Sequence, residues 1–106
     1  MNTTSDNQPS TWTFLTNHAH VLLCLVESSD MRMRDIALRV GITERAVQRI
    51  IADLRDEGYL SLSREGRRNT YHINTDKPLK HPIEKHRKIA DLIRLIHEGT
   101  EMKCAK

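Results

Sequence analysis

The chain has 106 residues, of which 17 are Lys or Arg and 14 are Asp or Glu, so its formal net charge is +3. This length is enough for one domain with a modest core and too short for two. The mild basic excess permits a nucleic acid or an anionic membrane surface as a partner and requires neither. The longest apolar run, Val21–Val26, is far shorter than the roughly 20 residues of a transmembrane helix, so we expect no membrane span.

The N-terminal segment, residues 1–11, is polar and lacks both the basic and the apolar region of a signal peptide. We expect it to be a disordered arm. Cys24 and Cys104 lie far apart in the sequence and form no disulfide framework. The cysteine usage therefore favours a cytoplasmic location.

From Trp12 the pattern becomes helical, with Thr16 as the expected N-cap. The helix is expected to end in the turn-rich residues 27–30, "ESSD". Residues 31–33, "MRM", alternate and predict a very short strand. "RDIALRV" then predicts a short helix that stops at Gly41.

The next helix is predicted to begin after the N-cap Thr43 and to end at Glu57, before Gly58. Two helices joined by this short turn need a small residue and a glycine, which Ala37 and Gly41 supply, so the sequence predicts a helix–turn–helix. On a helical wheel, the apolar residues of the second helix fall on one side. Its other side carries Arg45, Gln48, Arg49 and Ala52.

Arg and Gln are the side chains that read guanine and adenine edges in a major groove. The outward side of the second helix is therefore predicted to contact DNA bases, and its N-terminal end near Thr43 to hold a phosphate. The alternative is that these residues only solvate an exposed helix.

"YLSLS" and "NTYHIN" alternate apolar and polar residues on either side of "REGRR", which predicts a hairpin that turns at Gly66. Three arginines crowd this turn in spite of their mutual repulsion. We interpret Arg64, Arg67 and Arg68 as contacts to the DNA backbone or minor groove. A solvated basic loop is the alternative.

Residues 75–81 are expected to form a linker, and Pro82 to begin a final helix that ends at Gly99. Apolar residues spread over half or more of its wheel, wider than one core-facing stripe. We therefore expect a homodimer in which two recognition helices lie about one DNA turn apart. The alternative is that Phe14 and Leu25 of the first helix cover these residues within one monomer. The expected dimerisation residues are Ile83, Ile89, Leu92, Ile93 and Ile96.

His20 and Cys24 share a helix face, but the other histidines and Cys104 are scattered, whereas zinc needs three or four ligands together. No glycine-rich phosphate loop and no nucleophile with a partner base is present. We expect no metal, no cofactor and no enzymatic activity.

The stretch "RDIALRVGITERAVQRIIADLRDEGYLSLSREGRRNTYHIN" resembles the winged helix–turn–helix transcription regulators, especially small proteins of MarR or ArsR character. The resemblance implies a mainly α fold with a small β-hairpin: a three-helix core plus wing, with an added C-terminal helix. It places base contacts on Arg45, Gln48 and Arg49, with Thr43 and Glu44 at the start of the helix. MarR proteins have longer flanking helices that enclose a ligand pocket, so the resemblance leaves any effector open.

The expected organisation is an arm (1–11), a winged helix–turn–helix (12–74), a linker with a dimerisation helix (75–99) and a tail (100–106). The expected function is sequence-specific binding of double-stranded DNA in transcription regulation. Two alternatives stay open. One is a winged-helix protein-interaction module without specific DNA binding, and the other is a metal-responsive repressor.

Overall fold

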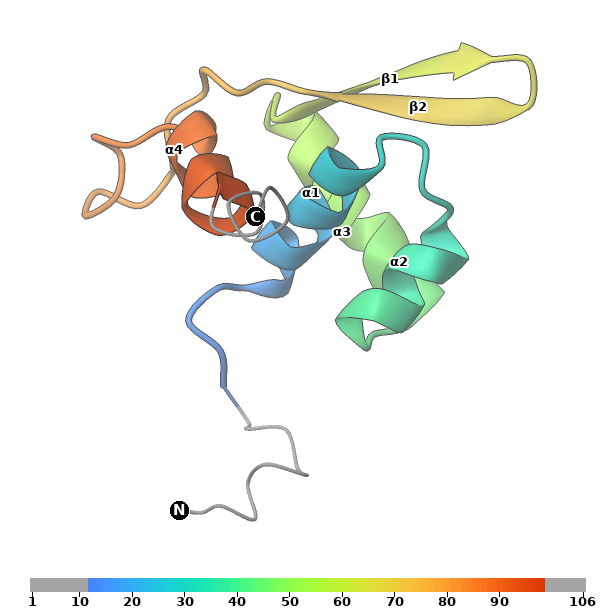
Figure 1. The fold of residues 1–106 in the computed structure, drawn as a ribbon, viewed down its shortest axis with the longest axis horizontal. Coiled ribbons are helices and arrows are strands. Elements are labelled where there is room, and N and C mark those ends of the chain that lie inside the picture. The colour runs from blue at the N-terminus through green and yellow to red at the C-terminus, as the bar shows by residue number, and fades with distance from the viewer. Residues whose placement is uncertain (1–11, 99–106) are drawn as a thin grey trace.

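The computed structural model describes residues 12–98. Figure 1 shows helices α1, α2 and α3 clustered together, with a long hairpin extending to one side and α4 packed on the other. In chain order the elements are α1 (Asn17–Glu27), α2 (Met33–Val40), α3 (Glu44–Asp56), β1 (Leu60–Glu65), β2 (Arg68–Ile73), α4 (Ile89–Ile93) and η2, a π-helix (Arg94–Glu98). The predicted architecture of a three-helix core, a wing and an added C-terminal helix is confirmed.

The helix boundaries follow local signals in the sequence. The hydroxyl oxygens of Thr16 and Thr43 accept hydrogen bonds from the backbone N–H groups of Ala19 (3.4 Å) and Ala46 (3.0 Å), as N-caps do. Gly41 ends α2 with φ 88°, a left-handed conformation that glycine adopts without steric cost. Both predicted N-caps and the predicted stop of α2 are confirmed.

One hydrophobic core joins the three helices to the base of the hairpin and to the start of α4. Val21 and Leu25 of α1, Ile36 of α2 and Val47 of α3 are each 0% exposed. The core is completed by Leu22, Cys24, Ala37, Ile50, Ile51, Tyr59, Leu60, Tyr71 and Ile89. Burial raises the pKa of the Cys24 thiol, and the neighbouring Arg39 guanidinium opposes this shift.

The hairpin is a two-stranded antiparallel sheet in which Leu60 pairs with Ile73 and Glu65 with Arg68. Only Gly66 and Arg67 lie between the strands, so the loop is shorter than the predicted "REGRR" loop. Gly66 has φ 65°, and no non-glycine residue of the described chain has a positive φ. A glycine followed by a residue with negative φ is typical of the type II′ turn, whose twist suits a two-residue hairpin.

The predicted strand at residues 31–33 is wrong. Residues 31 and 32 have no regular structure, and Met33 is already the first residue of α2. The contact with the sheet is made earlier, where the backbone N–H of Tyr71 donates a 2.9 Å hydrogen bond to the carbonyl of Ser29. This hydrogen bond attaches the segment before α2 to β2, in the place where a third strand was predicted.

The predicted final helix begins seven residues too early. Residues 82–86 form turns, and Lys88 forms an isolated antiparallel bridge with Pro78. The helix starts only at Ile89, after Lys88, whose backbone N–H donates a 2.9 Å hydrogen bond to the Asp91 carboxylate. This bond lowers the pKa of Asp91, and the nearby Arg87 and Arg94 guanidinium groups act in the same direction. Residues 81–88 are all exposed, so a helix there would have no apolar face to pack against the core. The predicted stop at Gly99, the arm 1–11 and the tail 100–106 lie outside the described residues.

Candidate nucleic-acid interface

Helix α3 has one buried and one exposed side. Val47, Ile50 and Ile51 are buried in the core. The residues exposed away from the core are Glu44, Arg45, Gln48, Arg49, Ala52, Asp53, Arg55 and Asp56. The structure thus places all the side chains predicted to reach DNA bases on the solvent side, with Thr43 as the cap at the start of the helix.

The turn between α2 and α3 sets how α3 is presented. The backbone N–H groups of Gly41 and Ile42 both donate to the Ala37 carbonyl, at 2.8 and 3.1 Å. These bonds close the end of α2 and redirect the chain within three residues. Ile42 packs against the core, which holds the first turn of α3 beneath α2. Figure 1 shows α3 running from this turn toward the hairpin.

The carboxylates at the C-terminal end of α3 are partly neutralised within the chain. The Asp53 carboxylate lies 2.9 Å from Nε2 of His18 in α1, and Glu57 lies 3.4 Å from the Lys80 ammonium. In the part of the chain that the structure describes, Arg45 and Arg49 form no ion pair. The N-terminal half of α3 carries these two guanidinium groups and one carboxylate, that of Glu44, so its net charge is positive, which favours an anionic partner.

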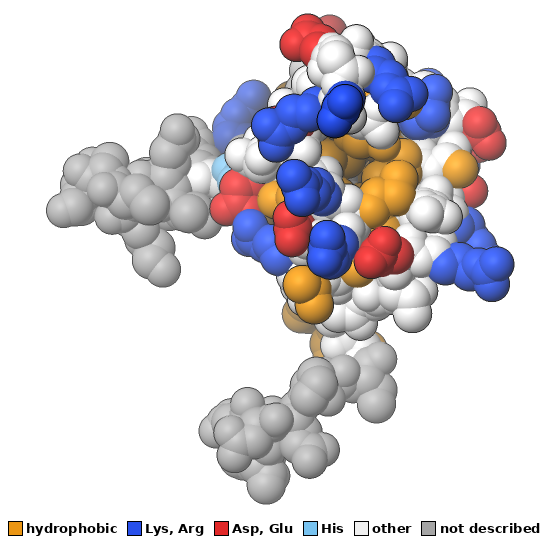
Figure 2. Space-filling view, turned by 90° about the vertical axis from the view of Figure 1, so that its right-hand side faces the viewer, with side chains coloured by type: hydrophobic (Ala, Val, Ile, Leu, Met, Phe, Trp, Pro, Cys, Tyr) orange, Lys and Arg blue, Asp and Glu red, His pale blue; other side chains and the backbone are white. Residues whose placement is uncertain are grey.

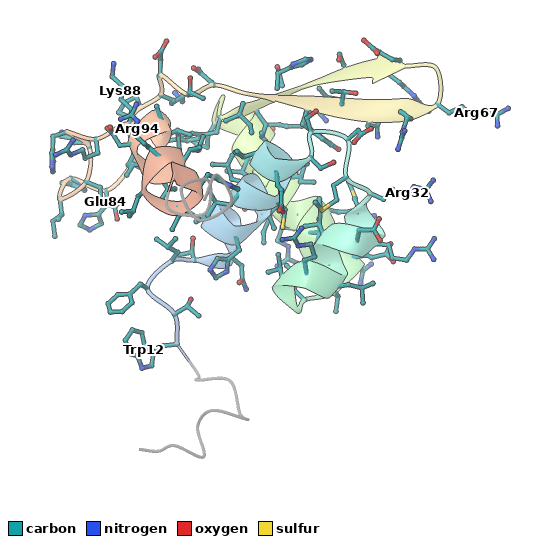
Figure 3. All side chains as sticks on the ribbon, viewed as in Figure 1. Trp12, Arg32, Arg67, Glu84, Lys88 and Arg94 are labelled. Carbon is teal, nitrogen blue, oxygen red and sulfur yellow. The ribbon has the colours of Figure 1, made fainter. Side chains whose placement is uncertain are left out.

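The wing arginines are all exposed but differ in their partners. Arg68 forms an ion pair with Asp30 at 3.4 Å. Arg64 and Arg67 have no ion-pair partner within residues 12–98. Arg67 occupies the hairpin turn and points outward from its tip (Figure 3). Arg64 thus stands on β1 and Arg68 on β2, with Arg67 between them in the turn.

The sequence did not single out Arg32. It is exposed, precedes α2 as its N-cap residue, and projects from the same side of the molecule as Arg67 (Figure 3). Figure 2 looks onto this side and shows Lys and Arg side chains along the hairpin at the top and again at the centre and right, with a few carboxylates between them. Arg32 stands directly before α2, where an arginine and the first N–H groups of a helix can hold an anion together. This position is the signal that could have identified Arg32.

The predicted dimerisation residues divide into two groups. Ile89 is 4% exposed and lies in the core of its own chain, so it cannot form a free surface. Ile93 packs against that core, and Leu92 is half-buried. Ile83 is 77% exposed and Ile96 37% exposed.

Other large exposed hydrophobic side chains occur away from the hairpin tip. Leu95 of η2 is 73% exposed. Trp12 and Phe14 precede α1, are 63% and 92% exposed, and stack edge to face with ring centroids 5.0 Å apart. Figure 3 places Trp12 on the segment that leads into α1, below the helices and far from Arg67.

Within residues 12–98, no three His, Cys, Asp or Glu side chains come together in a way that could hold a metal ion. His20 shares a helix face with Cys24, but its Nδ1 is within 3.1 Å of the Asn17 side-chain oxygen. Over the same residues, no helix is both long and apolar enough to cross a membrane.

Comparison with known proteins agrees with this geometry. Residues 16–61 match a family described as winged helix–turn–helix DNA-binding, a segment that runs from the N-cap of α1 into β1. No curated protein matches the chain. The helix–turn–helix predicted from the sequence is confirmed.

Two solved structures share the fold. The first is the zinc-dependent MarR family transcriptional regulator AdcR in its Zn(II)-bound state, with a TM-score of 0.52 and 22% identity over 91% of this chain and 62% of AdcR. The second is MepR, a transcription regulator of the Staphylococcus aureus multidrug efflux pump MepA, with a TM-score of 0.53 and 13% identity over 96% of this chain and 71% of MepR. This chain thus spans less than two thirds of the length of AdcR. The predicted resemblance to MarR-type winged helices is confirmed for the fold.

Proposed function

We propose that this protein is a homodimeric regulator of transcription that binds double-stranded DNA with sequence preference, in the cytoplasm. The observation that carries the proposal is the exposed side of α3, where Arg45, Gln48 and Arg49 face solvent without an ion-pair partner among residues 12–98. These side chains stand on the second helix of a helix–turn–helix that matches a DNA-binding family. An acidic or apolar side would instead have favoured a protein-interaction module.

In this proposal the two parts of the domain have different roles. The N-terminal half of α3 enters the major groove, where Arg forks read guanine O6 and N7 and Gln reads adenine N6 and N7. The hairpin follows the backbone beside it, and Arg64 and Arg67 neutralise phosphates. The Lys80 ammonium beside Glu57 reduces repulsion between the far end of α3 and the DNA.

The dimer is supported by the exposed apolar side chains that lie away from the hairpin tip. Leu95, Ile83, Phe14 and Trp12 are each more than half exposed. Trp12 and Phe14 contact each other, and adjoining exposed hydrophobic side chains are typical of an interface. A two-fold dimer built there would carry both hairpins outward and leave both α3 helices free for two half-sites.

The experiment that tests the proposed function is selection of bound duplexes from a random pool, followed by sequencing. A near-palindromic motif with half-sites about one helical turn apart is expected. A pool that stays random after repeated rounds would contradict sequence preference. Failure to retain any duplex would favour the protein-interaction module.

A further inference from the structure

A cavity of 320 Å³ separates the hairpin from the segment that leads into α2. The polar residues that line it are Arg32, Arg67, Arg68, Asp30 and Asn69, and the apolar ones are Met31, Met33 and Tyr71. Three positive groups and one negative group leave a net charge of about +2 at neutral pH. Two separate segments of the chain therefore converge on one concave, basic site.

The two walls of this cavity are fixed to each other. The N–H of Tyr71 donates to the Ser29 carbonyl at 2.9 Å, which attaches the segment before α2 to β2. Next to this bond, the Ser28 hydroxyl donates to Asp30 at 3.1 Å. This arrangement holds the Asp30 carboxylate 3.4 Å from the Arg68 guanidinium.

Arg32 completes the site from the other side. It is the N-cap residue of α2, and its side chain makes no capping hydrogen bond, so the first N–H groups of the helix are not satisfied by it. Guanidinium groups and free helix N–H groups are the donors that phosphate oxygens prefer. The donor set is suited to a phosphate, and Met31, Met33 and Tyr71 form the apolar part of the lining.

We propose that this cavity seats one backbone phosphate of the bound duplex, and that Asp30 holds Arg68 until the phosphate replaces it. This inference rests on the proposed DNA-binding function. The Asp30 carboxylate occupies one guanidinium in the free protein and repels an incoming phosphate. On binding, Arg68 exchanges the carboxylate for the phosphate, while Arg32 and Arg67 contact the same group from either side.

We assign the phosphate to a duplex and not to a free anion because the Arg68 and Asp30 side chains are exposed to solvent. The Arg68 side chain is 62% exposed and that of Asp30 39% exposed, and ion pairs at such sites are weak. A free phosphate would gain little from them. A phosphate that belongs to a duplex already held by α3 is present at a high effective concentration, so the same weak contacts suffice.

The test measures duplex binding by fluorescence anisotropy at a series of salt concentrations, for the full chain and two variants. Asp30→Asn keeps the shape and removes the competing charge, so affinity for all duplexes should rise about two- to fivefold. Arg32→Ala should lower affinity for all duplexes by about the same factor and reduce the salt slope by about 0.9. Arg94→Ala is the matched control, because Arg94 lies on the opposite side of the molecule (Figure 3), and should change neither quantity.

Thermal melts of each variant establish that it is folded, and inorganic phosphate is compared with chloride at equal ionic strength. Phosphate is expected to displace the duplex no better than chloride. An Arg32→Ala slope equal to that of the natural chain, an Asp30→Asn affinity that does not rise, or displacement by free phosphate would overturn this inference alone. Absence of duplex binding by the natural chain would overturn the proposed function and this inference with it.

Discussion

The hydroxyl of Tyr59 donates a 2.7 Å hydrogen bond to the carbonyl of Pro78. Tyr59 follows α3 and is 6% exposed, so the bond attaches the C-terminal segment to the end of that helix. The Lys77 ammonium lies 5.4 Å from the centre of the same ring, a cation–π contact. Tyr59 therefore joins the helix–turn–helix to the part of the chain that leads into α4.

Tyr59→Phe should lower the free energy of unfolding by about 1 kcal/mol, because the Pro78 carbonyl loses its partner while the ring still fills the core. Urea denaturation followed by circular dichroism measures this change. The matched control is Tyr71→Phe, since Tyr71 is 5% exposed and its hydroxyl makes no side-chain hydrogen bond within the described residues. Equal losses in the two variants would contradict the importance of the Pro78 bond.

The same residue predicts how stability changes at alkaline pH. Burial raises the pKa of the Tyr59 phenol above its ordinary value of 10.0, and the nearby Lys80 ammonium opposes this shift. The unfolded chain therefore loses this proton first. The stability that depends on the neutral phenol is complete below pH 10.0 and is lost as the pH rises through the raised folded pKa.

The stability difference between the natural chain and Tyr59→Phe should accordingly be constant below this range and shrink above it. Urea denaturation of both chains at matched pH values measures the difference. Cys24 is present in both, so its own titration cancels. A difference that widened at alkaline pH would show that the phenol is not shielded in the folded state.

The helix–turn–helix could be predicted from the sequence because its signals are local. Thr43 caps the helix that follows it, and Gly41 ends the one before it, each through atoms within four residues. The outward side of α3 follows from the 3.6-residue period alone. The exposure of the candidate residues on α3 could therefore be predicted without knowledge of tertiary contacts.

The start of the final helix could not be predicted, because a long-range contact decides it. Pro82 is a valid first residue of a helix, but the N–H of Ile89 donates to the Lys77 carbonyl at 2.9 Å and Leu79 donates to the Arg87 carbonyl at 2.9 Å. These bonds close residues 77–89 into a loop. The position of Arg32 opposite the hairpin depends on a similar contact, the bond between Tyr71 and Ser29.

Gly41→Ala should destabilise the fold by about 1 kcal/mol through the backbone alone. Gly41 has φ +88°, which a side chain disfavours, although an added Cβ would meet no atom within 4 Å. Gly41→Asn should lose less, because asparagine tolerates the left-handed region better than alanine. Thermal denaturation of the two variants checks this order, and equal melting temperatures would contradict it.

Substitutions on α3 and on the hairpin should affect DNA binding differently. Arg49→Ala should cost about 1–3 kcal/mol on the preferred duplex and relax preference at one base position. Arg67→Ala should weaken binding to all duplexes alike and reduce the salt slope by about one. Anisotropy titrations on preferred and scrambled duplexes at several salt concentrations separate the two effects. If Arg67→Ala left the salt dependence of the affinity unchanged, Arg67 would not contact a phosphate.

A charge placed on η2 should disrupt the dimer. Leu95 is 73% exposed in one chain, so Leu95→Glu leaves the core intact but places a carboxylate in the proposed interface, where desolvation is costly. Sedimentation equilibrium should then report a monomer where the natural chain forms a dimer. The matched control is Leu38→Glu on α2, because Leu38 is 75% exposed and lies outside the proposed interface.

Loss of the dimer should also change how DNA is bound. A Leu95→Glu monomer should keep its affinity for a single half-site and lose the additional affinity for the full site, since that gain comes from holding two domains together. The two readouts distinguish a broken interface from a damaged domain. If Leu95→Glu and Leu38→Glu stayed equally dimeric, η2 would not take part in the dimer interface.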